Sequence, residues 1–159
     1  MFKSKKISVR KIVLLGLIVF WIMFIWSNSM FPAAESSEQS GAILEWINGW
    51  LLKVGDFQLS SFIVRKAAHM FEFFVLSLLV CCLGQVCEDG KCQSQGVKSI
   101  GRWTAWGIGV SAVVASIDEG IQLFVPGRSG EIRDVLVDCC GAVIGAMVVA
   151  VVTSLSRKI

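Results

Sequence analysis

The sequence predicts an all-α, polytopic membrane protein: a bundle of four transmembrane helices with one short amphipathic helix outside the membrane. Three observations predict this fold. The 159 residues are 55% hydrophobic and only 17% charged, whereas soluble domains carry roughly 25% charged residues. Apolar runs of the roughly 20 residues that a spanning helix needs occur four times. Between the first two runs, apolar residues recur at helical spacing. The length fits a single membrane domain over residues 1–159.

The first span is expected at about residues 12–31. A basic front followed by an apolar stretch is also typical of a cleaved signal peptide. Against cleavage, the apolar stretch is long, and residues 27–32 (SNSMFP) contain no small-residue cleavage pattern. A retained span is therefore the preferred interpretation, and cleavage is the alternative.

The segment after the first span is expected to begin as a loop at residues 35–41 and then to form a helix at about 42–54. One side of this helix is apolar and the other carries polar residues. The apolar side comprises Ile43, Trp46, Ile47, Trp50, Leu51 and Val54, and the polar side comprises Glu45, Asn48 and Lys53. Two interpretations stay open. The helix lies on the outer leaflet, or it docks as a cap over the bundle.

The remaining spans are expected at about residues 62–83, 103–125 and 132–152. Trp103 and Trp106 stand where an interfacial aromatic belt would place them. In the last span, the Gly141-x-x-x-Gly145 spacing allows another helix to approach closely.

Lysine and arginine are unevenly distributed between the two sides of the membrane. Ten lie at the N-terminus, in a loop at about residues 85–102 and in the tail, namely Lys3, Lys5, Lys6, Arg10, Lys11, Lys91, Lys98, Arg102, Arg157 and Lys158. Five lie on the opposite side, namely Lys53, Arg65, Lys66, Arg128 and Arg133. Because basic residues are retained on the cytoplasmic side, both termini are expected in the cytoplasm.

Neither a metal nor a cofactor is expected, although the chain has six cysteines. Cys81-Cys82 and Cys139-Cys140 lie in apolar runs, where thiols behave as small hydrophobic groups. Cys87 and Cys92 flank a polar loop, but their spacing matches no standard zinc pattern and no histidine is near. No basic stripe with interleaved aromatic residues suggests a nucleic-acid partner.

Ionisable residues inside the apolar runs are the candidate functional residues. A charge at bilayer depth costs about 2.5–3.5 kcal/mol, so these residues are expected to face a shared interior. Helical spacing places them on one face of each span, and all three faces fall in the outer half of the membrane. The simplest arrangement is a common polar cavity that opens to the outside.

Two sets of candidates follow. The candidate acid–base residues are His69, Glu72, Asp118 and Glu119. The candidate ligand-binding residues are Arg65, Lys66, Gln122, Arg128, Asp134 and Asp138. An alternative stays open, in which the charges only pair and pin three helices together. Carboxylates outnumber basic residues in this region, which favours protonated acids or room for a cationic ligand.

The order of these motifs resembles the VanZ-like family of bacterial integral membrane proteins. The motifs are Arg65-Lys66-x-x-His69-x-x-Glu72, Asp118-Glu119-x-x-Gln122-x-x-x-Pro126-Gly127-Arg128 and Asp134-x-x-x-Asp138-x-x-Gly141. The resemblance covers nearly the whole chain. Phe73 stands where a tyrosine is frequent in the family, and Asp138 where an asparagine is common. The resemblance implies a multi-pass protein of the bacterial plasma membrane that contributes to resistance against lipid-tailed, teicoplanin-like glycopeptides.

Three functional hypotheses follow. In the leading one, the protein changes envelope sensitivity to such antibiotics by binding membrane lipids or lipid-linked envelope precursors in the outward cavity. The second is a membrane-embedded acid–base enzyme that acts on lipid-linked phosphate or head groups. The third is a proton-coupled transporter. An oligomer is compatible with each of them.

Overall fold

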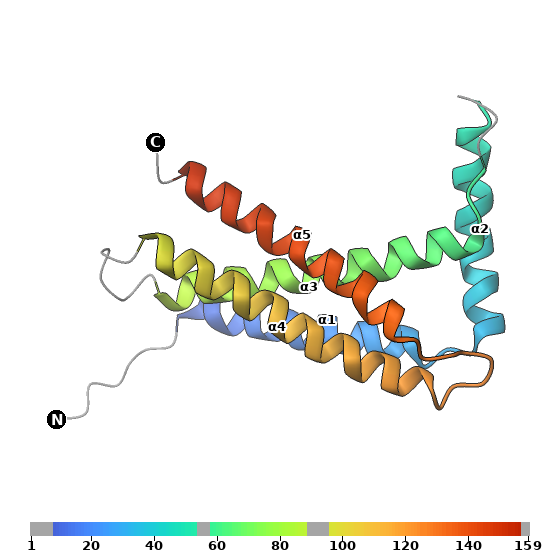
Figure 1. The fold of residues 1–159 in the computed structure, drawn as a ribbon, viewed down its shortest axis with the longest axis horizontal. Coiled ribbons are helices and arrows are strands. Elements are labelled where there is room, and N and C mark those ends of the chain that lie inside the picture. Colours follow the sequence, from blue (N-terminus) through green and yellow to red (C-terminus); the bar gives the residue numbers. More distant parts are fainter. Residues whose placement is uncertain (1–7, 54–57, 89–95, 157–159) are drawn as a thin grey trace.

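The protein is all-helical in the part that the structure describes, which comprises residues 8–53, 58–88 and 96–156 of a computed structural model. The helices are α1 (Val9–Ser29), α2 (Ala33–Leu51), α3 (Ser61–Glu88), α4 (Gly96–Gln122) and α5 (Ile132–Ser156) (Figure 1). Four of them, α1, α3, α4 and α5, are long and apolar enough to cross a membrane. The predicted fold class is therefore confirmed.

The four spanning helices form one bundle, and α2 lies across one end of it (Figure 1). The start of α1, the end of α3, the start of α4 and the end of α5 lie at the opposite end. Within the bundle, α3 packs most extensively against α5 and α4, and α1 packs mainly against α3. The α4–α5 connection and α2 thus share one end of the molecule, where the polar motifs are also found.

Small residues allow α5 to lie close to α3. A side-chain carbon on Gly145 would lie 2.5 Å from the Phe74 carbonyl oxygen, and one on Gly141 would overlap the Met70 carbonyl. Both glycines are buried. The close helix approach predicted from their spacing is therefore confirmed, with α3 as the partner.

The helix α2 is longer than expected, and the prediction of a loop at residues 35–41 is wrong. The helix begins directly after Pro32, whose carbonyl accepts a hydrogen bond from the Ser36 N–H at 3.1 Å. Proline is favoured at helix starts, where its missing N–H is not needed. The polar composition of this segment does not prevent a helix, and its Glu38 side chain is exposed. At the other end the helix stops at Leu51, and Val54 lies outside the described residues.

The loop expected at residues 85–102 is also shorter than predicted. Gln85–Glu88 continues α3, and the residues from Gly96 onward belong to α4. Hydropathy marks the part of a helix that contacts lipid, whereas backbone hydrogen bonding continues into the polar flanks. By contrast, α4 ends at Gln122 rather than near Val125, because the chain tightens into turns before Pro126, which cannot continue a helix.

Candidate functional site

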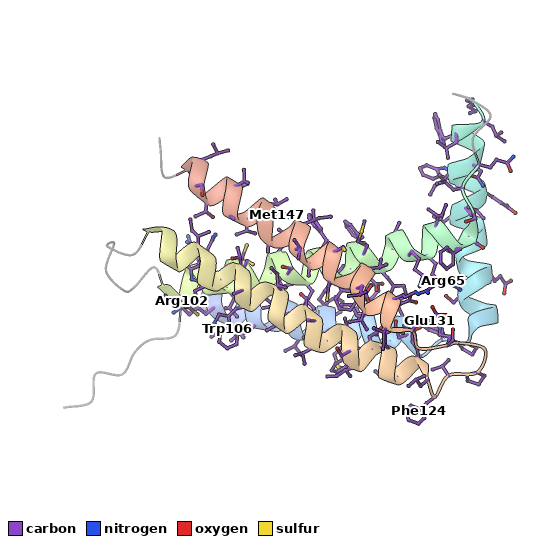
Figure 2. The ribbon with its side chains drawn as sticks, in the orientation of Figure 1. Arg65, Arg102, Trp106, Phe124, Glu131 and Met147 are labelled. Carbon is purple, nitrogen blue, oxygen red and sulfur yellow. The ribbon has the colours of Figure 1, made fainter. Side chains whose placement is uncertain are left out.

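A cavity of about 110 Å³ opens between α3, α4, α5 and the α4–α5 loop. This is room for several water molecules or one small head group. It is lined by Phe62, Arg65, Lys66, His69, Gln122, Gly127, Arg128, Ser129, Glu131 and Asp134. Figure 2 shows Arg65 on α3 and Glu131 in the loop at the end of the bundle that α2 crosses. Six of the predicted site residues line the cavity, namely Arg65, Lys66, His69, Gln122, Arg128 and Asp134.

The α4–α5 loop turns sharply to bring Arg128 to the cavity. Gly127 has a φ of 77°, a left-handed conformation that favours glycine. The Arg128 N–H closes the turn with a 3.2 Å bond to the Val125 carbonyl. The Pro126-Gly127 pair therefore acts as a turn device that aims the next side chain back toward the bundle.

Arg128 joins the loop to the end of α1. Its Nε donates to the Phe31 carbonyl at 2.9 Å, and one Nη donates to the Asn28 carbonyl at 3.2 Å. A cation is favourable at the C-terminus of a helix, where carbonyl groups lack helical partners. Burial and the nearby charge of Arg65 lower the pKa of Arg128, but an arginine remains protonated in proteins. The guanidinium is thus a fixed positive charge beside a second one.

Lys66 and Asp134 form an ion pair that joins α3 to α5. The ammonium group also lies 5.2 Å from the centre of the Phe62 ring. Because its charge is balanced by Asp134, Lys66 adds little positive potential to the cavity. The pair closes one side of it.

His69 and Glu72 lie on the α3 face that points toward the cavity. The His69 Nδ1 is 3.9 Å from the Glu72 Oε2, which is too long for a hydrogen bond. The other oxygen of Glu72 accepts a 2.8 Å hydrogen bond from the Asn28 amide. Of His69, Glu72 and Asn28, only His69 lines the cavity, and Glu72 lies behind His69.

Asp118 is fully buried between α4 and α1. Its Oδ2 accepts hydrogen bonds from the Ser29 hydroxyl at 2.7 Å and from the Gln122 amide at 3.0 Å. Its Oδ1 has no hydrogen-bond partner among the described residues. Gln122 connects this carboxylate to the cavity, which it lines.

Glu119 holds the start of α5. Its Oε2 accepts a 2.8 Å hydrogen bond from the Glu131 N–H, and its Oε1 accepts one of 3.2 Å from Gln122. A carboxylate is favourable at a helix N-terminus, where N–H groups lack partners. The adjacent carboxylates Asp118 and Glu119 therefore both have structural partners, which reasoning from the sequence did not foresee.

Asp138 lies on α5 and has no hydrogen-bonded contact with the other candidates. It is 1% exposed, and neither carboxyl oxygen has a hydrogen-bond partner in the described part of the chain. The structure thus separates the candidates into a cavity wall, a hydrogen-bonded layer behind it (Glu72, Asp118 and Glu119) and one isolated acid.

Sequence reasoning missed the contribution of α1. Asn28 and Ser29 donate to Glu72 and Asp118, the carbonyls of Asn28 and Phe31 accept from Arg128, and the Trp21 indole N–H donates to the Glu72 carbonyl at 2.9 Å. The available signal was the polar run Ser27-Asn28-Ser29 at the end of an otherwise apolar span. These contacts make α1 part of the site.

A metal centre has no support in the described ranges. Within residues 8–53, 58–88 and 96–156, no group of three His, Cys, Asp or Glu side chains is placed to hold a metal ion. Cys87 is exposed at the end of α3, and Cys92 lies outside the described residues. The polar groups at the cavity are instead suited to hydrogen bonding, to charge pairing and to holding an anion.

The comparison with protein families agrees with the motif order and the fold. A family model described as VanZ/LLP1 matches residues 14–153. Searches of curated proteins and of solved structures found no match. The matched region contains all of α3 and α4, most of α1 and α5, and every residue of the candidate site. The chain therefore belongs to the VanZ/LLP1 family, as a member with four helices able to span a membrane.

Proposed function

We propose that the cavity binds the anionic head group of an envelope lipid or lipid-linked precursor. We further propose that this binding lowers the sensitivity of the cell envelope to lipid-tailed, teicoplanin-like glycopeptides. The observation that carries the proposal is the pair of guanidinium groups, Arg65 and Arg128, at one cavity.

Neither guanidinium forms a close ion pair with a carboxylate among the described residues. Lys66, by contrast, is paired with Asp134. Arg128 donates its hydrogen bonds to the backbone carbonyls of Asn28, in α1, and of Phe31, just after it, and neutral carbonyls do not cancel its charge. Two like charges held close together repel each other, and an anion between them relieves that repulsion. Guanidinium groups also match the geometry of phosphate and carboxylate oxygens.

The surroundings of the cavity support a lipid as the source of the anion. The helix α2 crosses the same end of the bundle, and its Ile43, Trp46 and Trp50 are exposed. An exposed apolar face on a helix that lies across spanning helices suits the membrane interface. The Asn48 side chain forms two hydrogen bonds with the Leu59 backbone, of 2.8 and 3.1 Å. They hold α2 against the residues that directly precede α3. On this arrangement the cavity lies at head-group depth.

The lysine and arginine distribution supports an outward-facing cavity. In the sequence, the segments that meet at the cavity end hold five lysines and arginines, and the remaining segments hold ten. By the positive-inside rule, the cavity end is then the extracytoplasmic side. Lipid-linked cell-wall precursors and glycopeptide antibiotics meet on that side. The same site could therefore influence how much drug reaches its target.

The binding experiment uses the full chain in nanodiscs and two probes, undecaprenyl phosphate and short-chain phosphatidylglycerol. Arg65→Gln is expected to weaken binding about tenfold or more, because a charge-assisted hydrogen bond contributes about 1.5–3 kcal/mol. Arg133→Gln is the matched control, since Arg133 is exposed on α5 and does not line the cavity. Equal affinity of the wild type and Arg65→Gln for both probes would contradict the proposal.

A cellular measurement tests the second half of the proposal. Teicoplanin susceptibility of a sensitised strain should return toward that of cells without the protein when Arg65→Gln replaces the wild type at equal abundance. Cells with Arg133→Gln should keep the wild-type susceptibility. If neither variant changes susceptibility although Arg65→Gln binds more weakly, the cavity binds an anion but does not affect the drug.

A second candidate is acid–base chemistry on the bound head group. It is favoured by one observation: His69 lines the cavity with the carboxylate of Glu72 behind it. A histidine backed by a carboxylate can act as a general base. Analysis of lipid-linked precursors from cells with the wild type and with His69→Gln separates the two functions. A species that depends on His69 indicates chemistry, whereas unchanged lipids indicate binding alone.

A further inference from the structure

We propose that the cavity recognises a head group that carries a primary ammonium group close to its phosphate, as in a phosphoethanolamine lipid, and that Glu131 selects for the ammonium group. This inference rests on the proposed function, since it requires that Arg65 and Arg128 hold the phosphate. It names the class of head group and adds one specificity-determining residue.

The cavity contains charges of both signs that are not paired with each other. Arg65, Arg128 and Glu131 all line it, and Figure 2 shows Arg65 and Glu131 at the same end of the bundle. In the described part of the chain, the Glu131 carboxylate forms no close ion pair with either guanidinium. Lys66 and Asp134 also line the cavity, but they pair with each other. A ligand with one anionic and one cationic group therefore matches what is left.

The backbone of Glu131 is held in place, whereas its side chain is available to a ligand. The Glu131 N–H donates to the Glu119 carboxylate at 2.8 Å, and the Glu131 carbonyl accepts a 2.8 Å hydrogen bond from the Asp134 N–H. The side chain is exposed, and its carboxylate has no hydrogen-bond or ion-pair partner among the described residues. The loop thus presents a carboxylate at a fixed place in the cavity wall.

The size of the cavity limits how far apart the two charges of the ligand can stand. Its volume of about 110 Å³ holds one small head group. In phosphoethanolamine, only two carbon atoms separate the phosphate oxygen from the ammonium group. Guanidinium groups match phosphate oxygens, and an ammonium group is a compact donor to a carboxylate. The cavity therefore suits this short zwitterion better than a purely anionic head group.

The charge of Glu131 acts in opposite directions on the two kinds of head group. It attracts an ammonium group and repels a head group that carries only negative charge. Because the side chain is exposed, each effect is modest, about a two- to fivefold change in affinity. The affinities for the two kinds of lipid should therefore change in opposite directions when this charge is removed.

Two lipids that differ only in the amine, short-chain phosphatidylethanolamine and phosphatidylethanol, test the assignment. Each is titrated separately against the full chain in detergent micelles at neutral pH, and native mass spectrometry measures the bound fraction. The wild type is expected to bind phosphatidylethanolamine about two- to fivefold more tightly. Glu131→Gln should weaken the binding of phosphatidylethanolamine and strengthen that of phosphatidylethanol. Glu38→Gln is the matched control and should keep the wild-type ratio, since Glu38 is exposed on α2 and does not line the cavity.

The outcomes separate this inference from the proposed function. Equal wild-type affinities for the two lipids would overturn the inference, and so would an unchanged ratio in Glu131→Gln while Arg65→Gln weakens both lipids. A parallel change of both affinities in Glu131→Gln would also overturn it, because the carboxylate would then only stabilise the start of α5, where a negative charge is favourable. If Arg65→Gln changes neither affinity, the proposed function itself fails and the inference fails with it.

Discussion

At the scale of single residues, two buried acids accept hydrogen bonds from side chains on another helix. Ser29 of α1 is fully buried and donates to Asp118 of α4. Asn28, its neighbour, donates to Glu72 of α3. Since these acids lie in spanning helices, a lost donor is not replaced by bulk water. The stability of the protein should therefore be sensitive to substitutions of the donor residues in α1, although α1 carries no charge in this region.

Ser29→Ala should lower the free energy of unfolding by about 1–3 kcal/mol, because it removes a hydrogen bond from a buried carboxyl group that bulk water cannot reach. The matched control is Ser116→Ala, since Ser116 is exposed and its hydroxyl donates at 2.8 Å to the Ala112 carbonyl of its own helix. The control should change stability by no more than about 0.5 kcal/mol. Unfolding in SDS, followed by tryptophan fluorescence, measures both. Equal losses for the two variants would contradict the role assigned to Ser29.

Several residues of the site could be found from the sequence because a polar or charged group interrupts an apolar run. Arg65, His69 and Gln122 stand out for that reason, and each lines the cavity. Ser29 does not stand out, because a serine near the end of a span is common and its partner is 89 residues away in the sequence. The sequence also did not reveal which partner each site residue has. The bond from the Glu131 N–H to Glu119 depends on a loop conformation that no spacing rule predicts.

At the scale of helices, the contact between α3 and α5 sets the geometry of the site. It aligns Lys66 with Asp134 and determines how far the two walls of the cavity stand apart. Helix association in lipid relies on close packing, because apolar side chains gain little by leaving one apolar environment for another. The two buried glycines of α5 provide that packing.

Gly141→Ala should disrupt this contact, because its new side-chain carbon would overlap the Met70 carbonyl, a backbone atom that cannot move alone. Overpacking of this kind typically costs about 1–3 kcal/mol. Gly109→Ala on α4 is the matched control, since no atom lies within 4 Å of its added carbon. Thermal unfolding in detergent should show a clear loss for Gly141→Ala and none for Gly109→Ala. An unchanged midpoint for Gly141→Ala would mean that α3 and α5 are not tightly packed there.

Hydropathy and spacing predicted the helices themselves, but not where they end. The apolar part of each span was identified, and the GxxxG spacing indicated a close helix contact. The polar first half of α2 and the polar ends of α3 and α4 were interpreted as loop, although they are helical. The polar composition of those segments carries no apolar period from which a helix could be recognised.

At the scale of the whole molecule, the ends of the bundle differ in chemistry. One end carries the cavity, α2 and the α4–α5 loop. The other end carries the start of α1, the end of α3, the start of α4 and the end of α5. The proposed function requires the cavity end to face outward, and the distribution of basic residues favours that orientation.

Labelling of intact cells with a membrane-impermeant maleimide tests the orientation without removing native cysteines. Cys87 is exposed at the end of α3, away from the cavity, whereas Cys81, Cys82, Cys139 and Cys140 lie within spanning helices. The wild type should therefore stay unlabelled until the membrane is permeabilised. Ser129→Cys at the cavity and Glu38→Cys on α2 should both be labelled in intact cells, since both positions are exposed. Labelling of the wild type in intact cells, with no increase in either variant, would place the cavity in the cytoplasm and remove its access to envelope precursors on the outer surface.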